Sequence, residues 1–328
     1  MKVKIYFLAD VFYYAYYIEG FYKLCGKNKV EFSRKEFPAF PERTFAAIIE
    51  SGNKKLKIVI DAYDTPRISP ELLEWCDIYA KVNFNDKNLP SINHRKIIPI
   101  GPSFGIKIWS MPETVYFAFS NYIKSNGEIH FKRNFFANYW RQYKRLQLKE
   151  YNINSSIEDN YVYFISSLWK KEKNTNSNRA DFILACKELE GVKFEGGFAP
   201  RSDGNSLGLE GFVNERISLK EYLKRIKESF VVFNTPAVED CLGWKLAEYL
   251  ALGKAIISTQ NYNMLPASLV HGQHLHYVSN VKGELKLAIE KLRLDPEYRI
   301  FLEKNSRKYF LDNLLPEVVV KKLIKEFL

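Results

Sequence analysis

The chain has 328 residues, of which 46% are hydrophobic and 27% are charged. This composition is typical of a soluble globular protein, and the length suits two domains rather than one. No run approaches the ~20 consecutive apolar residues of a membrane-spanning helix. The formal net charge of +11 lies mostly before residue 150, which predicts one local anionic neighbour rather than a protein that coats nucleic acid. The four cysteines form no CxxC pair, so reduced thiols in the cytoplasm are expected.

The first hundred residues alternate strand patterns with helix patterns. The apolar run of residues 5–9 ends at Asp10 without a small-residue cleavage site, so a buried strand is favoured over a signal peptide. Strands alternating with helices predict a parallel sheet that is covered on both faces. The predicted strands are Lys4–Leu8, Lys57–Ile60, Ile78–Val82 and Lys96–Ile100, and the predicted helices are Phe12–Leu24, Glu42–Glu50 and Ser69–Trp75.

A strongly amphipathic helix is predicted over Asn134–Tyr151. Its aromatic and aliphatic side chains fall within an arc of about 140°, and Arg or Lys residues occupy the opposite side. We expect this arc to pack on the protein's own core. The alternative is contact with a membrane surface, where the basic residues would meet anionic headgroups. The residues of the arc are Phe135, Phe136, Tyr139, Trp140, Tyr143 and Leu146.

A polar segment before the strand predicted at Tyr161–Ser166 marks the expected domain boundary, which gives domains of residues 1–155 and 156–328. The second half repeats the alternation of strands and helices. Gly196–Gly197 follows a short predicted strand and is expected to form a tight turn. The remaining predicted elements are strand Val192–Phe194, helix Leu219–Glu228, strand Phe230–Asn234, helix Trp244–Leu252 and strand Ala255–Ser258.

The loop after Asn234 is the place where a ligand is expected, because ligands of open α/β sheets bind at the carboxyl ends of the strands. The following helix opens after Gly243, and its unpaired amides suit an anion. Glu248 lies among apolar neighbours on that helix, where a carboxylate needs hydrogen-bond donors. A ribose diol would supply them. An ion pair with Lys245 is the alternative, and it would not explain the apolar surroundings.

The run from Asp240 to Ser258, DCLGWKLAEYLALGKAIIS, resembles the donor-site motif of GT-B glycosyltransferases. It is most similar to the retaining family with two acids separated by seven residues (group 1, or family 4-like). The resemblance extends more weakly from about Tyr161 to the end, where residues 301–328 resemble the closing segment of that family. It implies two Rossmann-like domains around a central cleft, with an acceptor in the N-terminal domain and a nucleotide sugar in the C-terminal one.

The resemblance also implies roles for individual residues. Glu248 would hold the donor ribose, Asp240 would lie near the transferred sugar, and Gly243 and Trp244 would offer amides to the diphosphate. The sequence departs from the family at three points. Glu239 competes with Asp240, Ser167 stands where the family has a phosphate-binding Arg, and the chain lacks the usual Gly-rich turn after Ser258. The positive charge of the missing Arg would come from Lys170, Lys171, Lys173 or Arg179. The predicted donor-binding residues also include Lys245, Ser258 and Thr259.

On the acceptor side, Asp10, Asp61 and Asp64 follow predicted N-terminal strands, although each is also an ordinary turn or cap residue. Retention of anomeric configuration follows if Asp240 matches the first acid of the motif, whereas a strong base among the three aspartates would suit inversion. The chain has no Asp-x-Asp triplet, so we expect no bound cofactor and no required metal. His271, His274 and His276 are candidate zinc ligands, and two of them would lie on one face of a strand. A strand without bound metal is favoured over a zinc site.

These observations favour a glycosyltransferase that transfers a sugar from a nucleotide sugar to an acceptor hydroxyl. The expected setting is bacterial surface polysaccharide or glycoconjugate synthesis. The expected partners are a nucleotide sugar, a glycan or lipid-linked acceptor and an anionic membrane, but no nucleic acid. The location would be the cytoplasm, at the inner face of the plasma membrane. The alternatives are a sugar-nucleotide epimerase on the same scaffold and a basic protein that binds membranes or nucleic acid.

Overall fold

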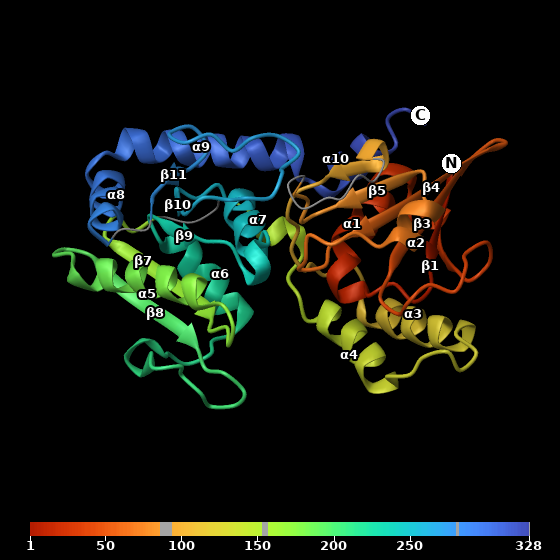
Figure 1. The fold of residues 1–328 in the computed structure, drawn as a ribbon, viewed down its shortest axis with the longest axis horizontal. Coiled ribbons are helices and arrows are strands. Elements are labelled where there is room, and N and C mark those ends of the chain that lie inside the picture. Colours follow the sequence, from red (N-terminus) through yellow and green to blue (C-terminus); the bar gives the residue numbers. More distant parts are fainter. Residues whose placement is uncertain (86–93, 153–156, 280–281, 328) are drawn as a thin grey trace. The chain divides into compact units, whose positions relative to one another are not determined.

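A computed structural model describes residues 1–85, 94–152, 157–279 and 282–327 (Figure 1). It divides the chain into two compact units. The N-terminal unit consists of Met1–Glu150, Met264–Pro266 and Asp312–Leu328, and the C-terminal unit consists of Tyr151–Asn263 and Ala267–Leu311. The domain boundary predicted between residues 155 and 156 lies outside the described residues. Within the described part, no helix combines the length and apolar character needed to cross a bilayer.

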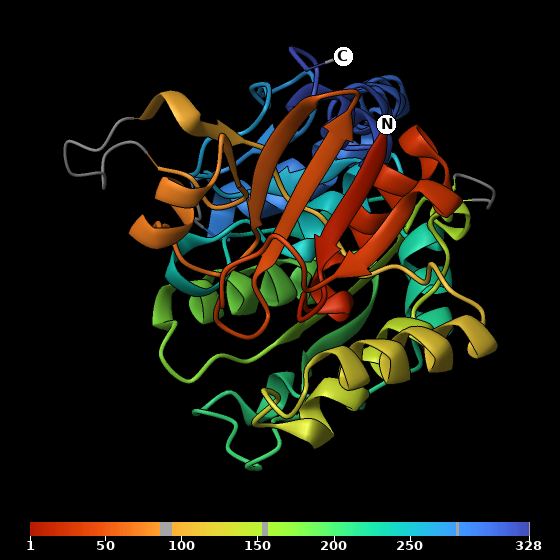
Figure 2. The ribbon, with the colours of Figure 1, turned by 90° about the vertical axis from the view of Figure 1, so that its right-hand side faces the viewer.

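The N-terminal unit is built on a six-stranded sheet of order β2-β1-β3-β4-β5-β6 (Figure 2). Parallel pairing joins β1 to β2, β4 to β5 and β5 to β6, while β3 is antiparallel to both β1 and β4. The α/β class is confirmed, but this sheet is mixed rather than fully parallel. The strands are β1 (Lys2–Tyr6), β2 (Val30–Ser33), β3 (Phe45–Ser51), β4 (Lys54–Asp61), β5 (Ile78–Lys81) and β6 (Ile97–Pro99).

The strand β3 corrects the helix predicted over Glu42–Glu50. A short apolar run does not distinguish a buried helix from a buried strand by its periodicity. Here the two residues Gly52 and Asn53 join β3 to β4 in a hairpin, and Gly52 has the positive φ of 56° that such turns require. The residues Phe45–Ile49 are consequently buried as a strand in the middle of the sheet.

Helices of the N-terminal unit begin at clear capping residues. Asp10 accepts a hydrogen bond from the amide of Phe12, and Ser69 accepts one from Leu72. The last helix returns to α1 at Gly20, where a Cβ atom would stand 2.3 Å from the carbonyl oxygen of Pro316. The helices are α1 (Val11–Cys25), α2 (Pro70–Trp75), α3 (Met111–Lys124), α4 (Lys132–Tyr143) and α10 (Pro316–Leu323).

The helix predicted over Asn134–Tyr151 ends earlier, at Tyr143, and is followed by a single short turn at Leu148–Glu150. The carbonyl of Leu146 accepts a hydrogen bond from the amide of Lys107 at 2.9 Å, so tertiary pairing replaces the next helical turn. Of the arc predicted to pack internally, Tyr139 and Leu146 are buried, and Tyr139 stacks on Trp109 at 5.9 Å, while Phe135, Phe136 and Tyr143 are half-buried. Trp140 remains 47% exposed.

The C-terminal unit contains two parallel sheets, β7-β8 and β11-β10-β9. The amide of Phe230, before β9, donates to the carbonyl of Tyr161 in β7 at 3.0 Å. Helix α9 begins in this unit and its last two residues belong to the N-terminal unit. The strands are β7 (Tyr161–Ser167), β8 (Lys193–Ala199), β9 (Val232–Asn234), β10 (Ile256–Ser258) and β11 (His276–Tyr277), and the helices are α5 (Lys173–Glu188), α6 (Leu219–Glu228), α7 (Trp244–Ala251), α8 (Lys282–Leu294) and α9 (Pro296–Asn313).

The prediction of a tight turn at Gly196–Gly197 is wrong, because both residues belong to β8 and pair with β7. Their φ angles are 111° and 147°, and a Cβ on Gly196 would lie 1.9 Å from the carbonyl oxygen of Phe164. The two glycines therefore permit close approach of neighbouring backbone rather than a reversal of the chain.

Candidate functional site

A pocket opens in the C-terminal unit at the carboxyl ends of β7 and β8 and the start of α6. This is the edge of a parallel sheet where ligands of α/β proteins bind. Two cationic side chains, several hydroxyl groups and four aliphatic side chains line it. The lining residues are Ile165, Ser166, Ser167, Ala199, Arg216, Ile217, Leu219, Tyr222 and Lys245.

Lys245 and Glu248 meet at the hydroxyl group of Tyr222. The Lys245 ammonium donates to that hydroxyl at 3.4 Å, and the hydroxyl donates to the Glu248 carboxylate at 2.9 Å. Lys245 also lies over the Tyr222 ring, 4.8 Å from its centroid. Glu248 is 6% exposed and stands behind Tyr222, so the tyrosine connects this buried acid to the pocket.

The pKa of Lys245 is lowered to about 8. Burial is the main cause of this lower pKa; the neighbouring Glu248 opposes the shift, and the neighbouring Arg179 adds to it. Burial likewise lowers the pKa of Arg179 to about 10. The Arg179 guanidinium donates to the carbonyl of Ser167 at 2.7 Å. Two cations therefore lie close together near the end of β7, where an anionic ligand would relieve their mutual repulsion.

Of the four basic residues considered for phosphate binding near Ser167, only Arg179 is buried; Lys170, Lys171 and Lys173 are exposed. Sequence reasoning missed Tyr222 entirely. Its position on the apolar face of α6 gives the sequence no reason to separate it from core residues such as Leu223 and Ile226. Only the tertiary contact with Glu248 distinguishes it.

The loop that carries Asp240 has an unusual backbone. Glu239 and Asp240 have φ angles of 50° and 57°, which non-glycine residues adopt at a cost of roughly 1–2 kcal/mol each. The side chain of Asn263 holds this loop by donating to the carbonyl of Asp240 at 2.8 Å. Both acidic side chains are exposed, so the competition between Glu239 and Asp240 stays open.

The other predicted donor residues surround the start of α7 and the end of β10. Gly243 is the N-cap of α7, and Trp244 is its first residue. Ser258 is buried and accepts a hydrogen bond from Asn234 at 2.9 Å, while the hydroxyl of Thr259 donates to that of Thr235 at 2.9 Å. Ser258 and Thr259 are thus hydrogen-bonded within the unit and are not among the residues that line the pocket.

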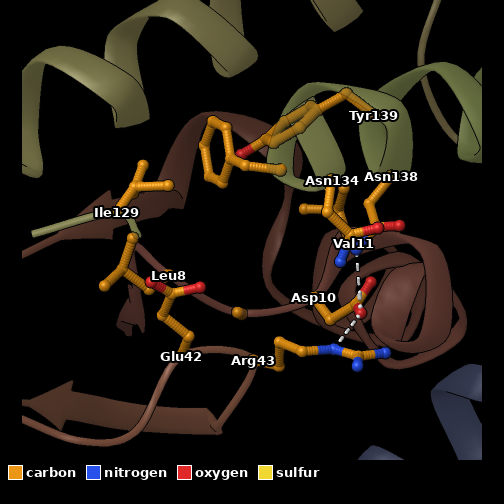
Figure 3. Close-up of a pocket in the computed structure, with 11 residues that line it drawn as sticks. Leu8, Asp10, Val11, Glu42, Arg43, Ile129, Asn134, Asn138 and Tyr139 are labelled. Atoms are coloured by element: carbon orange, nitrogen blue, oxygen red, sulfur yellow. Dashed lines mark hydrogen bonds and ion pairs between the residues drawn. The ribbon is translucent and has the colours of Figure 1, made fainter. Parts of the chain in front are cut away.

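A second pocket belongs to the N-terminal unit and surrounds Asp10 (Figure 3). The Asp10 carboxylate is buried and accepts hydrogen bonds from Arg43 at 2.8 Å and from Asn138 at 3.0 Å. Arg43 has a positive φ of 76°, and its side chain is 46% exposed. Figure 3 also shows Glu42 and Asn134 at this pocket. These groups hydrogen-bond hydroxyls, and the cavity of about 20 Å³ has room for a single hydroxyl group or water molecule rather than for a whole sugar.

Asp61 and Asp64 have different surroundings. Asp61 ends β4, is 6% exposed, and forms an ion pair with the fully buried Lys81 at 2.8 Å. The hydroxyl of Tyr79 donates to the same carboxylate at 2.6 Å. Asp64 lies exposed in the following loop. Of the three aspartates proposed for the acceptor side, only Asp10 lines the described N-terminal pocket.

The three histidines use ring nitrogens within the C-terminal unit. His271 and His274 accept hydrogen bonds from the amides of Tyr277 and Val270, both at 3.0 Å. His276 lies 3.0 Å from the hydroxyl of Tyr298, and burial lowers its pKa to about 4. Only His276 belongs to a strand, so the strand predicted for all three was too long. The part of the chain that the structure describes contains no group of three potential metal ligands.

No protein-family model matches the chain, and no curated protein matches it. Similar solved structures include a glycosyltransferase from Rickettsia africae, with 12% identity and a TM-score of 0.48 over 82% of this chain and 69% of that chain. TarM shows 10% identity and a TM-score of 0.47, over 81% of this chain and 48% of TarM. HepE from Anabaena, solved with UDP and glucose, shows 11% identity and a TM-score of 0.44, over 78% of this chain and 65% of HepE.

Proposed function

We propose that this protein is a glycosyltransferase that moves a sugar from a nucleotide sugar to an acceptor hydroxyl. The observation that carries the proposal is the cationic pocket of the C-terminal unit. Lys245 and Arg216 line it together with Ser166 and Ser167. Bond cleavage in a nucleotide sugar leaves negative charge on the diphosphate. Preorganised cations and hydrogen-bond donors stabilise that charge as it develops.

Glu248 and Tyr222 would bind the nucleoside part of the donor. A carboxylate accepts two hydrogen bonds from a vicinal diol, such as that of a ribose. The hydrogen bond from Tyr222 at 2.9 Å fixes one oxygen of Glu248 and so orients the carboxylate. Gly243 and Trp244 would offer amides to the diphosphate at the start of α7.

A hydroxyl group of the acceptor would bind in the Asp10 pocket of the N-terminal unit, where Asp10, Arg43 and Asn138 suit such a group. The finer parts of the proposal are a glycan or lipid-linked acceptor, a role in bacterial surface polysaccharide synthesis, and activity at the inner membrane face. Transfer would retain configuration, with Asp240 near the sugar, and would need no metal. The acid-x7-acid spacing and the missing Asp-x-Asp triplet support these two points.

The test is a thermal-shift screen of the protein with UDP-, GDP-, dTDP- and CMP-sugars. A true donor at a hundred times its dissociation constant adds about 2.7 kcal/mol to the free energy of unfolding. We expect one nucleotide class to raise the melting temperature of the wild type and to have little effect on Glu248→Gln. The matched control is Glu190→Gln, which changes an exposed acid of the same unit and should behave as wild type.

The melting temperature without ligand shows whether each variant is folded. A shift that survives in Glu248→Gln would remove Glu248 from the donor site while leaving sugar-nucleotide binding intact. The absence of a shift with every nucleotide class would reject the proposal. Product analysis with the identified donor then separates transfer from epimerisation, because an epimerase changes the sugar nucleotide without an acceptor.

A further inference from the structure

Helix α3 of the N-terminal unit carries an exposed row of large apolar side chains, called here the outer face of α3. The residues recur at intervals of four and fall within an arc of about 140° on the helix. Over this length the row spans about 18 Å. The outer face consists of Met111 (42% exposed), Val115 (44%), Tyr116 (67%), Phe119 (55%) and Ile123 (76%).

The opposite face of α3 buries small or polar residues. Thr114, Ala118 and Asn121 are 4%, 5% and 0% exposed, and Asn121 donates a hydrogen bond to the hydroxyl of Tyr139 in α4 at 2.8 Å. Phe117 also points inward and packs on the buried Trp109, with ring centroids 4.7 Å apart, so α3 has an apolar contact with the unit in addition to its exposed row. Local packing does not cover the outer face, so it is available to an external apolar environment.

Two further exposed aromatic residues belong to the neighbouring helix, Phe131 at the N-cap of α4 and Trp140 within it. Helices α3 and α4 pack side by side (Figures 1 and 2). The rings of Phe119 and Phe136 join them, with centroids 5.4 Å apart. The residues around them are basic. Residues 124–149 contain Lys124, Lys132, Arg133, Arg141, Lys144, Arg145 and Lys149, with Glu128 as the single acid.

We propose that the outer face of α3 docks on the surface of an anionic lipid bilayer. The apolar row would enter the boundary between headgroups and acyl chains, and the surrounding lysines and arginines would contact anionic headgroups. The Lys144 ammonium lies 4.9 Å from the Trp140 ring centroid, so a cation and an interfacial aromatic residue are already adjacent.

The basic charge and the apolar row together favour a bilayer over the other occupants. A nucleic acid would be attracted by the basic residues, but it offers no partner for Ile123 and Val115. A protein partner with an apolar groove would also cover the row, but it would not account for the seven basic residues between positions 124 and 149, which anionic headgroups explain. This inference rests on the proposed function and specifies its membrane contact, with the outer face of α3 in place of the arc of α4.

The experiment is co-sedimentation of the full chain with lipid vesicles. The vesicles contain phosphatidylcholine alone or with roughly a third phosphatidylglycerol, at about 0.05 M and about 0.5 M NaCl. We expect binding to the anionic vesicles at low salt and about tenfold weaker binding at high salt. The double variant Phe119→Ser/Ile123→Ser should bind at least about tenfold more weakly than wild type.

The matched control is Leu287→Ser/Leu294→Ser, which removes two side chains of α8 that are 68% and 71% exposed. This control should bind vesicles as wild type does. Equal binding by the α3 variant and the wild type would overturn the proposal, as would equal losses in both double variants. A wild type that does not bind anionic vesicles would also overturn the proposal. If sedimentation velocity then showed a wild-type dimer and a monomeric α3 variant, the outer face of α3 would be a dimer interface instead.

The donor screen keeps this proposal separate from the proposed function. The α3 variant should retain the melting-temperature shift with the donor nucleotide, because that pocket lies in the C-terminal unit. Vesicle binding without any nucleotide shift would support the surface and reject glycosyl transfer. A melting-temperature shift with a nucleotide sugar but no vesicle binding would support the donor site and overturn the membrane surface.

Discussion

The pockets of the two units differ in their balance of charge. In the N-terminal unit, each buried aspartate that follows a strand is paired with a cation: Asp10 with Arg43 and Asp61 with Lys81, both at 2.8 Å. In the C-terminal unit, Lys245 and Arg216 line the pocket, while the acid Glu248 stands behind Tyr222. The two aspartates of the first unit are neutralised by their cations, with Glu42 as one further acid at the Asp10 pocket, whereas the second pocket has an excess of positive charge.

This difference shows that the pairing of charges, more than their number, indicates the ligand. A neutralised pocket rich in hydrogen-bonding groups suits the hydroxyls of a glycan. A pocket with a desolvated lysine gains most from a multivalent anion, because the anion relieves the repulsion between Lys245 and the nearby Arg179. Under the proposed function, the diphosphate would bind in the C-terminal unit and the uncharged hydroxyls in the N-terminal unit. Four measurements test this assignment.

The largest expected effect is on stability, at Asp61. Substitution of Asp61→Asn leaves the ammonium of Lys81, which is fully buried, without its countercharge. We expect the free energy of unfolding to fall by about 3–5 kcal/mol, measured by urea denaturation. The control Asp64→Asn changes an exposed residue of the next loop and should stay within about 0.5 kcal/mol of wild type. Equal stability of the two variants would mean that Asp61 and Lys81 are not a buried pair.

The next effect is on ligand binding, at Lys245. Removal of its charge in Lys245→Met should weaken binding of the donor's nucleoside diphosphate by about 10–100-fold, the value of one charged hydrogen bond. Calorimetric titration measures it. The control is Lys170→Met, an exposed lysine in the loop after β7 that should bind as wild type does. A larger loss in the control would move the phosphate site from α7 to that loop.

A smaller effect on stability is expected at Asp10. The variant Asp10→Asn keeps a good N-cap for α1. It leaves Arg43 unpaired, but that side chain is 46% exposed and remains hydrated. We therefore expect a loss of about 1 kcal/mol or less in the free energy of unfolding, together with a higher KM for the acceptor. A KM increase confined to the donor would contradict the assignment of the acceptor to the N-terminal unit.

Much of the fold followed from the sequence because its signals are local. Ser69 before Pro70 predicted the start of α2, and the predicted helix Leu219–Glu228 matches α6 at both ends. The strand β3 was misassigned because its apolar run has no decisive period. Helix α3 was not predicted, because its apolar residues lie both on the exposed outer face and, at Phe117, toward Trp109, so the pattern does not indicate one core-facing side.

The site was harder to predict for a related reason. Residues on one helix, such as Lys245 and Glu248, are related by spacing that the sequence displays. Tyr222 comes from a different helix, and its contact with them exists only after α6 and α7 pack. The same applies to the pairing of Asp10 with Arg43 and of Asp61 with Lys81, which no local sequence pattern predicts. Charge balance, on which the comparison of pockets depends, is therefore a tertiary property.

Between pH 7 and pH 8, the smallest expected effect is a pH dependence of donor binding. Because burial lowers the pKa of Lys245 to about 8, the unliganded lysine is half deprotonated near that pH. Only the protonated form attracts a diphosphate, so affinity should fall about twofold between pH 7 and pH 8 and up to about tenfold by pH 9. The ligand does not contribute, because its phosphate ionises near pH 6. Calorimetry near pH 8.5 should also show proton uptake on binding.

The variant Lys245→Arg provides the control for this dependence. Its guanidinium stays charged throughout the range, so its affinity should be nearly constant from pH 7 to pH 9 without proton uptake. A constant affinity in the wild type would mean that the lysine is more hydrated than its burial indicates. The same slope in both proteins would assign the titration to another group. A fall in affinity with pH in the wild type alone would show that the ammonium group of Lys245 supplies the titrating positive charge of the C-terminal pocket. The contrast with Asp10, whose charge is paired with Arg43, depends on that unpaired charge.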